Sequence, residues 1–64
     1  MEELDTFILN KNINNSIRKG MAGTILLIHS EERFTAEFVN KDGTNVTDKG
    51  FGTFIISLSD VTLN

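Results

Sequence analysis

The sequence predicts a small all-β domain, and three observations support this prediction. Short runs of β-branched and aromatic residues recur along the 64-residue chain, and such runs are typical of strands. Turn signals separate the runs, and the strongest is the Asp42-Gly43 pair, because Asp-Gly favours a tight hairpin turn. The pair Ile13 and Ile17 has helical spacing but lies in an asparagine-rich segment that is too short for a stable helix.

The N-terminal part of the chain predicts one strand and a loop. Residues 5–9 read as the first strand, with Phe7 and Leu9 as its core pair. Asparagine dominates residues 10–16 and breaks regular structure, because it tolerates left-handed geometry and competes for backbone hydrogen bonds. We expect Ile13 and Ile17 to pin this loop to the rest of the domain.

Residues 24–28 predict the second strand. This β-branched, apolar run follows a turn bracketed by Gly20 and Gly23, where glycine supplies a positive φ or a close backbone approach. If strict alternation holds, the inward face carries Thr24, Leu26 and Ile28, and the outward face carries Ile25 and Leu27. One outward residue can still be covered, and Leu27 is the one that we expect to be exposed.

Residues 34–39 predict the third strand, because large apolar residues alternate with small or polar ones. This alternation places Phe34, Ala36 and Phe38 on one face. The polar residues 29–32 are expected to join the second and third strands as an antiparallel hairpin. Residues 40–43 carry the turn signal that ends the third strand.

The C-terminal part predicts two further strands. Residues 44–47 are expected to begin the fourth strand, which turns or bulges at residues 48–50 and resumes over residues 51–57. Gly52 indicates a bulge or a sharp bend, the device that closes small barrels. Residues 58–61 indicate a short 3₁₀ turn, and residues 62–64 a short fifth strand.

Together these elements predict a single SH3-like β-barrel domain over residues 1–64, with one short 3₁₀ turn before the last strand. An OB-type barrel is the alternative, but it usually needs a longer chain and a helix. A chain of this length buries only about 60% of its unfolded surface, so a core without disulfides is marginal but sufficient.

The composition indicates the cellular location of the protein and the kind of partner that it binds. The acidic start, residues 1–5, lacks the basic segment and apolar core of a signal peptide, and no apolar run approaches the roughly 20 residues that span a bilayer. We therefore expect a cytoplasmic protein that does not bind membranes. The net charge of −3 suits a basic partner protein, because complementary charge steers association.

Nothing in the sequence predicts catalysis, a metal site or a cofactor. His29 is the one histidine and no cysteine is present, so a zinc site would need Glu31 or Glu32, and adjacent ligands in a tight turn rarely converge tetrahedrally. The same two carboxylates lack the separation and the pocket that acid–base catalysis requires. A barrel of this size is filled by its own side chains, which leaves little room for a substrate.

Three segments resemble the domain of unknown function 4926 family of small bacterial proteins. Residues 18–25 fit its K-x-G-x-x-G-T-V turn and strand, residues 37–43 its E-F-V-D-x-D-G hairpin entry, and residues 58–61 the start of its terminal L-P-x-x-x-L segment. Asn14 and Ser59 stand where family members usually have proline, and both substitutions fall in predicted loops. The likeness covers nearly the whole chain and implies the fold more than an activity.

Some small proteins of this kind are similar in size and charge to antitoxins and toxin-immunity proteins. We therefore expect a non-catalytic module that binds and neutralises a cognate toxin, such as a basic nuclease. The expected partner-binding residues are acidic side chains and apolar anchors: Leu27, Glu31, Glu32, Glu37, Asp42, Asp48 and Phe51. For Phe51 and Val39 the competing expectation is core packing, and for the acidic residues it is an ordinary solvated surface.

Two other functions stay open. A KOW-like nucleic-acid binder would use the basic residues Arg18, Lys19, Arg33 and Lys41, although the overall charge opposes it. An accessory or regulatory subunit would bind another protein by adding a strand to a free sheet edge.

Overall fold

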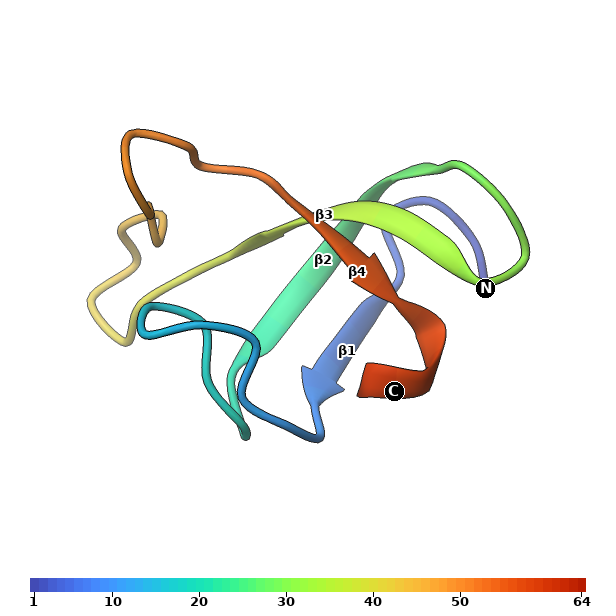
Figure 1. Ribbon diagram of the computed structural model, residues 1–64, viewed down its shortest axis with the longest axis horizontal. Coiled ribbons are helices and arrows are strands. Elements are labelled where there is room, and N and C mark those ends of the chain that lie inside the picture. Colours follow the sequence, from blue (N-terminus) through green and yellow to red (C-terminus); the bar gives the residue numbers. More distant parts are fainter.

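The computed structural model describes all residues, 1–64, and shows one curled antiparallel sheet (Figure 1). Its strands are β1 (Thr6–Leu9), β2 (Ala22–Ile28), β3 (Arg33–Phe38), β4 (Phe54–Ser57) and β5 (Val61–Leu63), and the 3₁₀ turn η1 (Leu58–Asp60) joins β4 to β5. The strand order is β4-β3-β2-β1-β5, and the sheet curls into a half-barrel. The predicted fold class, a small five-stranded SH3-like barrel with a 3₁₀ turn before the last strand, is confirmed.

The inner face of the sheet carries an aromatic core. Phe7 packs edge to face on Phe34 and on Phe38, with ring centroids 5.3 and 5.5 Å apart. Such pairs are favourable because the edge of one ring meets the electron-rich face of the other. The core residues are Phe7, Leu9, Ile17, Ile25, Phe34, Ala36, Phe38, Val46, Ile56 and Val61. The predicted inward residues of the first and third strands are therefore confirmed.

Gly23 makes this aromatic packing possible. Its cross-strand partners are Phe7 on β1 and Phe38 on β3, and both rings fold over it. A Cβ at this position would lie 2.9 Å from Cε1 of Phe38 and closer still to Cζ of Phe7. Only glycine allows the rings to approach the backbone this closely.

The predicted faces of the second strand are wrong for Thr24 and Ile25, because Thr24 lies between the buried residues Gly23 and Ile25. Ile25 is fully buried and pairs with Ala36, whereas Leu27 is 51% exposed. The register between β2 and β3 shifts between Ile25 and Leu27, which marks a bulge at Leu26. A bulge adds one residue to a strand and reverses which face the following residues occupy. Gly23 and Ile25 therefore point inward before the bulge, and the predicted exposure of Leu27 after it is confirmed.

The predicted start of the fourth strand at residue 44 is also wrong, because β4 begins only at Phe54. Residues 44–53 form no strand, although Asn45 makes an isolated bridge to Val39. The predicted turn at residues 48–50 is confirmed, because the backbones of Asp48 and Phe51 exchange hydrogen bonds of 2.9 Å across it. This long β3–β4 connection is tied to the core by Val46, which is 5% exposed.

The predicted anchoring of the first loop is confirmed. Ile17 is fully buried, and Ile13 packs against the core. Asn14 shapes the loop, since its Oδ1 accepts hydrogen bonds of 2.8 Å from the backbone N–H groups of Ser16 and Ile17. Asparagine thereby builds the turn that delivers Ile17 to the core.

Candidate protein-binding surface

The structure divides the predicted partner-binding residues between two ends of the sheet (Figure 1). Leu27, Glu31 and Glu32 lie at or beside the β2–β3 turn, whereas Asp42, Asp48 and Phe51 lie in the β3–β4 connection. Glu37 is half-buried on β3 between these groups. Since β3 has six residues, it separates the two ends by about 17–20 Å. The predicted residues therefore do not form one cluster.

A hollow of about 470 Å³ opens at the end that carries Glu31 and Glu32. It is lined by Met1, Ile28, Ser30, Glu31 and Leu58, three of which are hydrophobic. The hollow is thus an apolar depression with polar groups beside it, which is the general plan of a protein-binding patch. The sequence did not reveal it, because its lining comes from the N-terminus, the end of β2 and η1.

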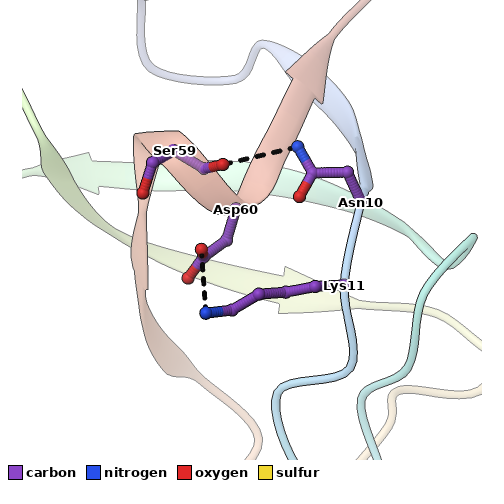
Figure 2. A network of polar contacts seen from close by, with 4 residues as sticks. All are labelled: Asn10, Lys11, Ser59 and Asp60. Atoms are coloured by element: carbon purple, nitrogen blue, oxygen red, sulfur yellow. Dashed lines mark hydrogen bonds and ion pairs between the residues drawn. The ribbon is translucent and has the colours of Figure 1, made fainter.

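Polar contacts fix the wall of the hollow that η1 provides (Figure 2). The backbone N–H of Asn10 donates to the carbonyl of Asp60 at 2.9 Å, and its side chain reaches the carbonyl of Ser59 at 3.4 Å. Lys11 Nζ lies 3.2 Å from Oδ1 of Asp60. On the other side, the N–H of Leu58 donates to the carbonyl of Glu32 at 2.7 Å. These contacts hold Leu58 in place between the end of β1 and the β2–β3 turn.

No salt bridge or hydrogen bond engages the side-chain carboxylates of the two glutamates beside the hollow. Glu31 and Glu32 are exposed, and the salt bridge of the molecule joins Lys11 to Asp60, so it neutralises neither of them. Glu2 and Glu3 are exposed as well and follow Met1, which itself lines the hollow. Four carboxylates therefore outnumber the one arginine at this end, Arg33 at the start of β3, and the excess negative charge favours a basic partner.

The acidic residues at the other end already serve the local structure. Ser16 Oγ donates to Oδ1 of Asp48 at 3.1 Å, which ties the β3–β4 connection to the first loop. Thr44 donates to Oδ1 of Asp42 through its hydroxyl at 2.6 Å and its backbone N–H at 3.0 Å. These hydrogen bonds, the hydroxyl one first, lower the pKa of Asp42 below its ordinary value because they favour the ionised carboxylate.

Phe51 and Val39 are exposed by 70% and 46%, so the expectation that they pack in the core is wrong. Both lie in the β3–β4 connection, which leaves the sheet instead of continuing it as a strand, and their side chains therefore find no layer to pack against. They remain available for a partner. Their exposure depends on the path of the connection, which no local pattern in the sequence indicates.

An apolar row that the sequence interpretation missed crosses the outer face of the sheet. Leu27 pairs with Thr35, and Thr35 pairs with Ile55, which is 57% exposed. Alternation along residues 54–57 could have revealed Ile55, because Ile56 faces the core. His29 adds a hydrogen bond of 2.6 Å between its Nε2 and Thr35 Oγ1.

One of the predicted basic residues, Lys41, lines a second hollow, and two others lie next to that hollow in the sequence. This second hollow, of about 390 Å³, is lined by residues 20–22 of the first turn and residues 39–41 of the β3–β4 connection. Lys41 belongs to its lining, and Arg18 and Lys19 immediately precede it in the chain. Arg33 lies at the opposite end of β3 and is not part of this group.

No group of three or more histidine, cysteine, aspartate or glutamate side chains is arranged to hold a metal ion. No helix has the length and apolarity needed to cross a membrane. Comparison of the chain with protein-family models, curated proteins and solved structures finds no match.

Proposed function

We propose that this protein is a non-catalytic protein-binding module whose acidic end binds a basic partner. The observation that carries the proposal is the 470 Å³ apolar hollow beside carboxylates that no hydrogen bond or salt bridge occupies. An apolar centre supplies affinity when a partner covers it, and rim charges orient the partner and speed its approach. The binding residues in this proposal are Met1, Glu31, Glu32 and Leu58 at the hollow, with Leu27 on the adjoining outer face of β2.

The proposed partner is a toxin, which would make the protein an immunity protein or antitoxin. A standard interface buries about 800 Å² on each partner. The surface of this molecule is 4285 Å², so one such interface would cover about a fifth of it. A chain of this size can therefore inhibit a toxin by binding it one to one and covering part of its surface. We also propose that the protein is cytoplasmic and that it belongs to the domain of unknown function 4926 family. The two glycines within residues 18–25 support the family assignment.

A charge-matched pair of variants tests the binding surface. Glu31→Gln with Glu32→Gln removes two negative charges beside the hollow, whereas Asn45→Lys with Thr47→Lys makes the same change in net charge at exposed positions of the β3–β4 connection. We expect the glutamine variant to weaken binding about tenfold and the lysine variant to leave it within about twofold. The measurement is calorimetry with the protein encoded by the neighbouring gene.

Each outcome has a defined meaning. Equal weakening by both variants would show that net charge steers the partner without a site at the hollow. Unchanged affinity in the glutamine variant would remove Glu31 and Glu32 from the interface. Expression of the neighbouring gene alone tests the toxin, and a harmless product would refute the inhibitor proposal while leaving protein binding open.

Nucleic-acid binding is the second candidate, because Lys41 lines the second hollow and Arg18 and Lys19 directly precede its lining residues 20–22. Phosphate contacts release counterions, so such binding weakens steeply as salt rises. A gel shift with single-stranded RNA at two salt concentrations tests it. Retention of the RNA at low salt by the protein, and its loss in a Lys41→Glu variant, would favour this candidate over protein binding.

A further inference from the structure

The strand β4 is a free edge of the sheet, and its backbone alternation shows which groups are unpaired. The N–H of Leu58, directly after β4, donates to the carbonyl of Glu32, directly before β3, which marks these two residues as a hydrogen-bonded pair at the end of the ladder. In an antiparallel ladder every second pair is hydrogen-bonded. Ile56 and Phe54 are therefore hydrogen-bonded to their β3 partners, Phe34 and Ala36. The N–H and C=O of Ile55 therefore point away from β3, and no hydrogen bond from elsewhere in the chain reaches them.

This edge lacks the features that protect natural edge strands. Such strands usually carry lysine, proline, a bulge or a covering segment, because a bare edge pairs with other chains. Residues 50–59 contain no charged residue and no proline, and the register of β4 against β3 has no bulge. The opposite edge, β5, has only three residues and directly follows the charged Asp60. The sheet is thus open to strand addition at β4.

We propose that β4 pairs in antiparallel orientation with β4 of a second copy of this chain. A two-fold axis at Ile55 lets the two Ile55 residues exchange backbone hydrogen bonds. The same register places the N–H of Ser57 opposite the carbonyl of Thr53 in the second copy, and the backbone of Thr53 makes no hydrogen bond within its own chain. The two half-barrels then share one continuous sheet.

Charge and shape favour a second copy over an unrelated segment. Because β4 is uncharged, two identical strands meet without like-charge repulsion. The two-fold axis turns the acidic ends of the copies away from each other, since Ser57 pairs with Arg33 next to the acidic turn. The half-exposed Ile55 side chains lie side by side on the outer face and lose contact with water. This inference does not depend on the proposed toxin binding.

Sedimentation equilibrium over about a hundredfold range of protein concentration tests the proposal. We expect the apparent mass of the 7.1 kDa chain to rise toward twice that value as concentration increases. Ile55→Lys places like charges next to each other at the axis and should lower the association constant at least about tenfold. Leu27→Lys is the matched control, because Leu27 is equally exposed on the same face but lies on the interior strand β2. It should leave the association constant within about twofold.

Amide hydrogen exchange of the unaltered protein gives an independent readout. Protection of the Ile55 N–H should rise with protein concentration, because this group bonds only in the pair. A monomer at every concentration, or an Ile55 N–H that exchanges freely throughout, would overturn the proposal and leave the edge to an extended segment of another protein. Equal loss of association in both lysine variants would overturn the placement of the interface at β4.

Discussion

Replacing Gly23 with alanine tests whether the aromatic rings above this residue dictate its identity. The added methyl group would lie 2.9 Å from Cε1 of both Phe7 and Phe38, and closer still to Cζ of Phe7. Neither ring has space to withdraw, because both are fully buried and Phe7 also packs against Phe34. The substitution must therefore push the core apart or bend β2 away from it.

The expected cost follows from two opposing effects. Overpacking of a well-packed core costs about 1–3 kcal/mol. Replacement of glycine by alanine recovers about 0.4–1 kcal/mol, because the unfolded chain becomes less flexible. The steric cost is the larger, and we expect a net loss of about 1–2 kcal/mol. For a chain of this size, each kcal/mol lowers the melting temperature by about 4–8 °C.

Thermal unfolding followed by far-UV circular dichroism measures this loss, since the chain has no tryptophan or tyrosine for fluorescence. Gly52→Ala is the control, because its Cβ would meet only Cγ2 of Thr47, at 4.0 Å, and its backbone has no positive φ. We expect this control to be neutral or slightly stabilising. Equal melting temperatures for the Gly23 and Gly52 variants would refute the role assigned to the aromatic packing.

Three further predictions follow from single contacts. Ile17→Ala should cost about 2–5 kcal/mol in denaturant unfolding, since this fully buried side chain anchors the first loop to the core, and a smaller loss would contradict the anchoring. Asp60→Asn should cost only about 0.2–1 kcal/mol, less at high salt, because its partner Lys11 is 60% exposed. The lowered pKa of Asp42 stabilises the turn above the ordinary aspartate pKa of about 3.9, and this contribution disappears as pH falls through the lowered pKa. An NMR titration in which Asp42 and the Thr44 amide respond at or above the ordinary aspartate pKa would contradict it.

The candidate site was only partly predictable from the sequence. Glu31 and Glu32 were identified correctly as exposed turn residues, because a polar break between two strand patterns is a local signal. The apolar centre beside them was not, since Met1, Ile28 and Leu58 come from three separate parts of the chain. The sequence predicted Asp48 as a partner-binding residue, but the structure shows that its carboxylate already accepts a hydrogen bond from Ser16.

The sequence by itself determined the all-β class, the aromatic core and the 3₁₀ turn before the last strand. These features depend on near neighbours, because alternation, β-branching and turn residues act over a few positions. Only the tertiary structure decided that a bulge at Leu26 turns Ile25 inward and that residues 44–53 leave the sheet. Both depend on strand register, which contacts between distant residues fix, and a shift of one residue reverses the faces of a strand.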